Sequence, residues 1–104
     1  MDQKTAKIVN SFAKIAKEEY PDCQVYLFGS RAKGTARKDS DYDFILVSKE
    51  FKKQNFLDRY AKAYFLKRNI PAAMDILCYT PEEFNKKKKE IGIVQEAVKE
   101  GIII

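Results

Sequence analysis

Apolar residues recur along the chain with two different periods, and the change of period predicts where helices and strands lie. Over residues 3–19, Ile8, Phe12 and Ile15 recur at helical spacing with lysines between them. This pattern is typical of an amphipathic helix with one buried face. Pro21 follows closely and would end the helix, since proline cannot continue it.

Three segments have the apolar, β-branched and aromatic composition of buried strands: QVYLFGS at 24–30, YDFILV at 42–47 and AAMDILCYT at 72–80. The first two are separated by a glycine-containing loop at 30–40, which is longer than a tight hairpin turn and has room for one helical turn. The last residues, 102–104, are three isoleucines. They predict a short strand on the chain's own sheet or an apolar tail that pairs with a second copy.

The remaining segments predict helices. Residues 54–68 have helical periodicity, and residues 93–100 form a further short helix. The run Thr80-Pro81-Glu82-Glu83 is typical of a helix start, with a capping threonine, a first-position proline and acids in the first turn. The helix that begins there would run through the lysines at 86–89. The inner face expected of the 54–68 helix consists of Phe56, Leu57, Tyr60, Ala61 and Tyr64.

This order of elements predicts an α/β (α+β) fold, in which helices back a small mixed β-sheet on one face. The length of 104 residues suits a single domain that spans residues 1–104. No internal repeat or linker divides the sequence.

The formal net charge of +5 is compatible with nucleotides, nucleic acid or an acidic protein as partners. The lysines at 86–89 follow one another directly, so they would circle a helix instead of lining one face. Direct nucleic-acid binding is therefore not expected, and most of the positive charge is interpreted as lysine on solvated helix faces.

Cys23 and Cys78 are the only cysteines, and the chain has no histidine. These counts argue against structural zinc and exclude acid–base catalysis by histidine. Two free thiols suit a reducing compartment, and no apolar run approaches the roughly 20 residues needed to cross a bilayer. The N-terminal residues also lack the continuous apolar segment of a secretion signal. A cytoplasmic protein without a membrane segment is expected.

Asp41 and Asp43 lie on the same side of the second predicted strand, because side chains alternate along a strand. Two like charges held so close need a neutralising partner, and a hard divalent cation such as magnesium suits oxygen ligands. Such a pair can hold two metal ions roughly 3.5–4 Å apart for phosphoryl or nucleotidyl transfer, with manganese as a substitute. Asp75, inside an otherwise apolar strand, is the best candidate for a third carboxylate.

Gly29 and Ser30 follow the first strand directly and open a basic loop that also contains Arg31 and Lys33. Glycine allows a sharp turn and close approach to a ligand, while free backbone N–H groups and a hydroxyl can hold phosphate oxygens. The loop matches neither the Walker pattern nor the dinucleotide-binding pattern. Acids for metal opposite donors for phosphate indicate a nucleoside-triphosphate site.

Each candidate also has a structural interpretation. Asp41 and Asp43 could belong to a capped turn at the start of a strand, and Asp75 could reach water from an edge strand. Arg31 and Lys33 could lie on a solvated loop. The combination of all these residues favours the site.

Phe28-Gly29-Ser30, ten further residues, Asp41-Tyr42-Asp43 and a later Asp75 together resemble the pattern of the nucleotidyltransferase superfamily that includes DNA polymerase beta and the kanamycin nucleotidyltransferases. The runs GSRAKG and SDYDF are similar to the minimal nucleotidyltransferases of bacteria and archaea. Those proteins are stand-alone domains commonly encoded beside a HEPN-domain protein, and several such pairs act as toxin and antitoxin.

The resemblance implies a polymerase-beta-like fold and a role for each matching residue. Gly29 and Ser30 would position the triphosphate, Asp41 and Asp43 would bind metal, and Asp75 would complete the catalytic site. Tyr42 departs from the pattern, which usually has an aliphatic residue there. The chain also lacks the extra domains that hold the acceptor in larger relatives, so a partner, a second copy or the acceptor protein itself must hold it.

Three functions remain open from the sequence. The first is magnesium-dependent transfer of an NMP, taken as AMP from ATP, to a hydroxyl such as a tyrosine of a HEPN-domain toxin. The second is an antitoxin that acts mainly by binding. The third is transfer to a small molecule such as an aminoglycoside.

Overall fold

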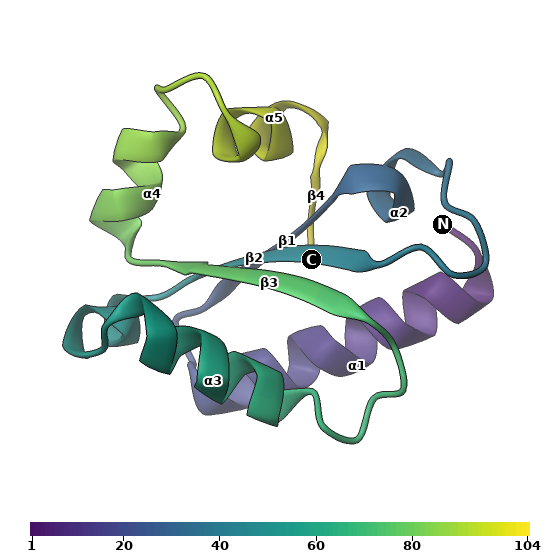
Figure 1. Cartoon of the computed structure of the whole chain (residues 1–104), viewed down its shortest axis with the longest axis horizontal. Helices are drawn as coiled ribbons and strands as arrows, with labels where there is room; N and C mark the ends of the chain where they lie inside the picture. The colour runs from purple at the N-terminus through teal and green to yellow at the C-terminus, as the bar shows by residue number, and fades with distance from the viewer.

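The computed structural model describes all 104 residues and arranges them around one four-stranded sheet (Figure 1). Its strands, in the spatial order β3-β2-β1-β4, are β1 (Gln24–Phe28), β2 (Tyr42–Val47), β3 (Met74–Tyr79) and β4 (Ile102–Ile103). Strand β1 is antiparallel to β2 and β4, and β2 is parallel to β3. The predicted mixed sheet is confirmed, and the C-terminal isoleucines join the chain's own sheet.

Five α-helices and one 3-10 helix complete the fold: α1 (Gln3–Glu19), α2 (Gly29–Lys33), η1 (Lys49–Lys53), α3 (Phe56–Leu66), α4 (Pro81–Lys87) and α5 (Ile93–Glu100). Gly29, expected to end the first strand, begins α2 instead, and this helix is the helical turn for which the 30–40 loop has room. Gly29 has a φ of 73°, in the left-handed region that favours glycine, and this turns the chain sharply after Phe28.

Side-chain caps fix where three of the helices begin. The Asp2 carboxylate accepts a hydrogen bond from the Thr5 N–H at 2.7 Å, and Asn55 caps α3 in the same way. At the start of α4, the side chains of Thr80 and Glu83 each accept from the other residue's backbone N–H. The predicted helix start at Thr80 is therefore confirmed as a capping box.

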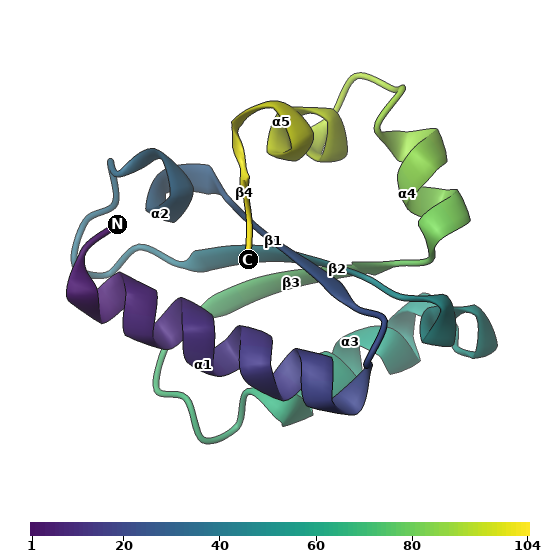
Figure 2. The same cartoon turned by 180° about the vertical axis from the view of Figure 1, so that it is seen from behind.

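Helices cover both faces of the sheet, so the expectation of a single covered face is wrong. Helices α1 and α3 lie on one face, and α4 and α5 lie on the other (Figures 1 and 2). The reason is that β2 is buried on both sides: Phe44 and Leu46 belong to the larger core cluster, while Ile45 and Val47 pack in a second cluster with Phe84 of α4. An alternating pattern would have left one side of this strand in water.

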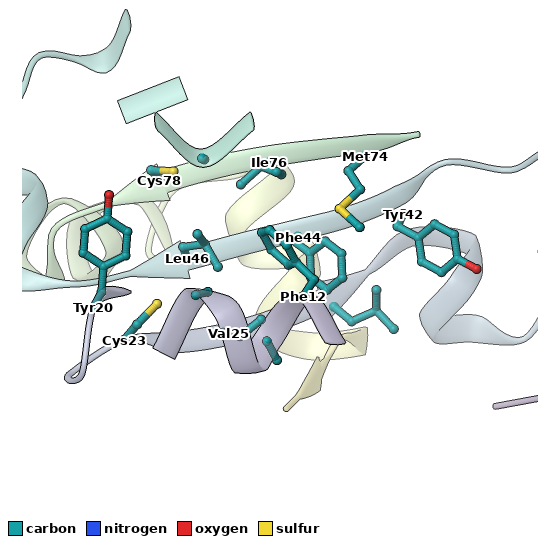
Figure 3. Packing of buried hydrophobic residues seen from close by; sticks show 14 of the residues in the cluster. Phe12, Tyr20, Cys23, Val25, Tyr42, Phe44, Leu46, Met74, Ile76 and Cys78 are labelled. Atoms are coloured by element: carbon teal, nitrogen blue, oxygen red, sulfur yellow. The ribbon is translucent and has the colours of Figure 1, made fainter. Parts of the chain in front are cut away.

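The larger core lies between α1 and the sheet. Figure 3 shows Phe12 of α1 beside Phe44 at the centre of β2, and their ring centroids are 4.7 Å apart. Val25 and Ile76 extend this layer into the neighbouring strands. No helix of the fold combines the length and apolar composition required to span a membrane.

Helix α3 turns a different face inward from the one expected. Its buried residues are Arg59 and Ala63, whereas Phe56, Leu57 and Tyr64 are 48%, 77% and 39% exposed. Arg59 can occupy an inner position because four groups of the chain bind its guanidinium, which replaces the lost hydration.

Candidate active site

The sheet brings Asp43 and Asp75 side by side. Strands β2 and β3 are parallel, and their register places Asp43 directly opposite Asp75. Both carboxylates lie on the face that α4 and α5 cover farther along the strands. Asp41 immediately precedes β2 and is exposed, as Asp75 is, whereas Asp43 is half-buried. The predicted neighbourhood of the three acids is therefore present at one end of the strand pair.

The three carboxylates have no cationic partner. None of them takes part in the ion pairs of the chain, all of which involve glutamates. Burial raises the pKa of Asp43, and the charges of Asp75 and Asp41 raise it further. The free protein thus holds uncompensated negative charge at this end of the sheet.

The donor set fits a hard divalent cation in its chemistry. Carboxylate oxygens are the ligands that magnesium prefers, and a cation would relieve the repulsion that raises the pKa of Asp43. The side chains as placed do not form a complete ligand cluster, since no three Asp, Glu, Cys or His groups lie close enough to hold a metal ion together. Any bound cation would therefore need further oxygen ligands, and a triphosphate can provide them.

Gly29 is pressed against the Asp43 carboxylate. Phe28 is the register partner of Asp43 across β1 and β2, so the next residue passes directly beside it. A Cβ at position 29 would collide with Oδ2 of Asp43, and the positive φ also disfavours any other residue. Ser30 follows, half-buried, at the start of α2. The structure thus brings Gly29 to the Asp43 carboxylate, whereas the binding of phosphate by this turn stays a prediction.

Arg31 points away from the carboxylates. Its guanidinium is buried, donates to the Ser40 carbonyl at 2.8 Å and lies 4.3 Å from the centroid of the Tyr42 ring. Longer hydrogen bonds, both 3.4 Å, reach the Lys38 carbonyl and the Thr5 hydroxyl. Arg31 therefore braces the loop that leads to Asp41. Tyr42, the residue that departs from the family pattern, supports Arg31 by packing its ring against the guanidinium.

Lys33 lies on the outside of α2, where α5 engages it. Its ammonium group is 2.8 Å from Glu100 and 3.6 Å from Glu96. The hydrogen bond and charge of Glu100, the largest contribution, raise the pKa of Lys33. The structure does not bring this lysine to the three aspartates, and its contact with a phosphate stays a prediction.

Tyr60 and Tyr64 of α3 lie near Asp75, which the sequence did not indicate. Burial raises the pKa of both tyrosines, and the charge of Asp75 contributes the next largest part. The Tyr64 hydroxyl donates to the Met74 carbonyl at 2.8 Å, one residue before Asp75. Their spacing of four residues predicts a shared helix face, but it does not distinguish a core face from a face beside Asp75.

The hollow bounded by Asp22, Tyr26 and Phe84, about 430 Å³ in volume, lies at the other end of the sheet and contains none of the candidate residues. This hollow is therefore not part of the candidate active site. Asp41 and Asp75 are exposed instead, and a large acceptor could reach them from solvent.

Comparison with known proteins gives the same family as the site. A family model described as a nucleotidyltransferase domain matches residues 9–103. The Haemophilus influenzae protein named probable protein adenylyltransferase MntA is 35% identical over 83 residues, which cover 77% of this chain and 71% of that protein.

Solved structures share the fold. A Sulfolobus solfataricus protein assigned to the nucleotidyltransferases aligns with a TM-score of 0.66 and 26% identity, over 96% of this chain and 78% of its own. A toxin–antitoxin structure with AMP-PNP aligns with a TM-score of 0.64 and 22% identity, over 90% and 69% of the two chains, and it supports the fold alone. With a family model matched over nearly its whole length and a relative 35% identical over most of both chains, the chain belongs to the nucleotidyltransferase domain family and is an enzyme of that class.

Proposed function

We propose that this nucleotidyltransferase moves AMP from ATP to a hydroxyl group of a partner protein, with magnesium as its metal. The observation that carries the proposal is the pairing of Asp43 with Asp75 across two parallel strands, with Gly29 packed against Asp43. Triphosphate-binding backbone and metal-binding oxygens are thereby adjacent, as nucleotidyl transfer requires.

Each residue has a specific task in this reaction. Asp41 and Asp43 supply oxygen ligands to the metal, and the backbone at Gly29 and the Ser30 hydroxyl bind phosphate oxygens. Arg31 supports the loop before Asp41 and does not contact the nucleotide. When bound, magnesium neutralises charge on the triphosphate and the carboxylates.

Asp75 orients the acceptor and takes its proton. The acceptor oxygen forms a bond to the α-phosphorus, the bond from that phosphorus to the bridging oxygen breaks, and pyrophosphate leaves. The hydroxyl proton passes to the Asp75 carboxylate, which is exposed and can meet an incoming side chain.

A protein is the acceptor that we infer. The relative from Haemophilus influenzae is named as a protein adenylyltransferase, and this chain covers most of that relative. Asp41 and Asp75 are exposed on this domain, so a docked protein can bring its own hydroxyl to them and align it. A tyrosine of a HEPN-domain toxin is the acceptor proposed, and its modification would be the antitoxin function. The buried free cysteines Cys23 and Cys78 suit a cytoplasmic setting.

The test combines the full chain with magnesium, ATP labelled at the α-phosphate and the HEPN-domain protein expected from the neighbouring gene. Mass spectrometry of that protein should show added multiples of the AMP mass, and Asp43→Asn should abolish them. An unmodified HEPN-domain protein, together with efficient transfer to a free small molecule, would refute the protein acceptor.

A further inference from the structure

Helix α3 carries an exposed apolar surface that the core does not use. Two adjacent rows at four-residue spacing run along the helix, and both are apolar or aromatic. Leu57 and Phe65 are 77% and 61% exposed, and Phe56 is 48% exposed. We name this surface the α3 stripe, and it consists of Phe56, Leu57, Tyr60, Ala61, Tyr64 and Phe65.

Other residues hold the helix in place, so the stripe is not needed for its docking to the sheet. Arg59 and Ala63 are buried against the core, and Lys62 forms an ion pair with Glu19 of α1 at 2.9 Å. A continuous apolar patch without a partner is unusual on a monomer and marks an interaction surface more often than a defect.

The stripe reaches the outer edge of β3 directly beside Asp75, although the Asp75 carboxylate lies on the face of the sheet opposite α3. At one end, Tyr64 donates to the Met74 carbonyl, directly before Asp75, and its ring stacks on Tyr60 at 6.4 Å between centroids. At the other end, Phe56 meets Tyr79 edge-on at 6.4 Å. The stripe therefore follows β3 from Asp75 toward the far end of that strand.

The surroundings of the stripe carry an excess of positive charge. Residues 49–68 contain seven lysines and arginines, of which Arg59 is buried against Glu83 and Lys62 is paired with Glu19. The other five exceed the two acids of this stretch by three charges. Arg68 lies 4.1 Å from the centroid of the Phe65 ring, at one end of the stripe. A partner suited to this surface presents apolar side chains with acidic residues around them.

We propose that the α3 stripe is the docking surface for the protein that accepts the nucleotide, and that it binds an apolar segment of that protein flanked by acids. The inference rests on the proposed function, because it takes the acceptor to be a protein. A segment seated on α3 would bring neighbouring residues of the same protein to Asp75, and this would provide the alignment that a second lobe gives in larger enzymes.

The test uses the double variant Leu57→Asp/Phe65→Asp in the full chain. Both side chains point into solvent, so the fold should keep its melting temperature, while the acids would oppose an acidic, apolar partner. Ile91→Asp is the matched control, since Ile91 is 97% exposed and lies between α4 and α5, away from the stripe. Calorimetry without nucleotide should give about tenfold or weaker affinity for the HEPN-domain protein in the double variant, and unchanged affinity in the control.

Two further measurements separate this inference from the proposed function. Binding of magnesium and a non-hydrolysable ATP analogue should be equal in wild type and double variant. If the wild-type chain binds the HEPN-domain protein but transfers no AMP, the docking surface stands and the proposed function fails. If AMP transfer and affinity are the same in wild type and double variant, the function stands and the docking surface is refuted.

Absence of any binding between the wild-type chain and the HEPN-domain protein would also refute the docking surface. Light scattering of the chain alone tests whether a second copy of the chain occupies the stripe. A wild-type dimer that becomes a monomer in the double variant would assign the stripe to a second copy and overturn the proposal.

Discussion

A cluster of charged side chains lies near each end of strand β3. The charges are unpaired in one cluster and paired in the other. At the carboxylate end, the charges of Asp75 and Asp41 act against the half-buried Asp43, and none of the three aspartates forms an ion pair. At the arginine end, the Arg59 guanidinium lies 2.7 Å from Glu83 and also binds the carbonyls of Phe51, Gln54 and Cys78. The aspartates have no basic side chain as an ion-pair partner, whereas Arg59 is neutralised by Glu83 of the same chain.

The pKa values of the two ends shift in opposite directions. Burial alone would raise the pKa of Glu83, but the Arg59 guanidinium and the hydrogen bonds of Thr80 outweigh it and lower the pKa. Burial and like charges raise the pKa of Asp43. The uncompensated cluster is where we propose that metal and nucleotide bind, whereas the compensated one stabilises the fold.

The largest effect is expected at the carboxylate end, on catalysis. Asp75→Asn keeps the shape of the side chain but cannot accept the proton, so transfer should fall roughly 10² to 10⁴-fold. Binding of an ATP analogue should remain largely intact. Single-turnover transfer of labelled AMP measures the loss, with Asp39→Asn in the exposed loop as the control. Full activity in Asp75→Asn would place this carboxylate among structural residues.

At the arginine end the effect should appear in stability. Arg59→Leu leaves Glu83 and several buried carbonyls without their donor, which should cost about 3 kcal/mol in the free energy of unfolding. Urea denaturation measures this, and the exposed Arg68→Leu should change it by less than about 0.5 kcal/mol. Under conditions in which Arg59→Leu remains folded, it should still transfer AMP. Loss of transfer from a fully folded Arg59→Leu protein would contradict the division of roles between the two ends.

The glycine beside Asp43 tests whether close packing matters at the carboxylate end. Gly29→Ala places a Cβ against Oδ2 of Asp43. It also puts alanine at a positive φ of 73°, close to the φ of 77° at Gly34. Both alanine variants should lose about 1–2 kcal/mol of stability through backbone strain. Gly34→Ala meets no neighbouring atom, so only Gly29→Ala should also slow transfer, by up to about 100-fold. Equal transfer rates in the two variants would show that the contact with Asp43 is unimportant.

The smallest effects should appear in the pH dependence of stability without metal. The penalty from Asp43 is absent below its ordinary pKa of 3.8, grows as the pH rises through the raised value and is complete above it. Asp43→Asn should therefore stabilise the metal-free protein at neutral pH. The Glu83 contribution is fully present above the ordinary value of 4.5 and is lost as the pH falls through the lowered pKa. Urea titrations of Asp43→Asn and Glu83→Gln from acid to neutral pH should deviate from wild type in opposite directions.

Much of the carboxylate end was predictable because it depends on local rules. Strand alternation placed Asp41 and Asp43 on one side, and a glycine after a strand indicated a turn close to a ligand. Asp75 is opposite Asp43 in the register, but it is exposed on the edge strand β3, so its apolar neighbours in the sequence do not bury it. Its role stays a prediction. Spacing within short segments was sufficient for these inferences.

The arginine end and α3 were not predictable in the same way. The sequence pattern of α3 favours an inward face with Phe56 and Tyr60, yet Arg59 is the buried residue. Its burial depends on carbonyls from η1 and β3 that become neighbours only after folding. The supporting role of Arg31 is not predictable for the same reason. Its acceptors, the Lys38 and Ser40 carbonyls, lie seven and nine residues away in an irregular loop.

Three side chains of helix α3 and the turn after it also protect the outer edge of β3. Arg59 donates to the Cys78 carbonyl, Tyr64 to the Met74 carbonyl and Lys67 to the Ala72 carbonyl. Unpaired carbonyls on an edge strand invite sheet extension by other chains, and this ends in aggregation. At the opposite edge, β4 has only two residues and offers little to extend. Strand β3, which contains Asp75, can therefore lie at the margin of the sheet without serving as a template for amyloid-like assembly.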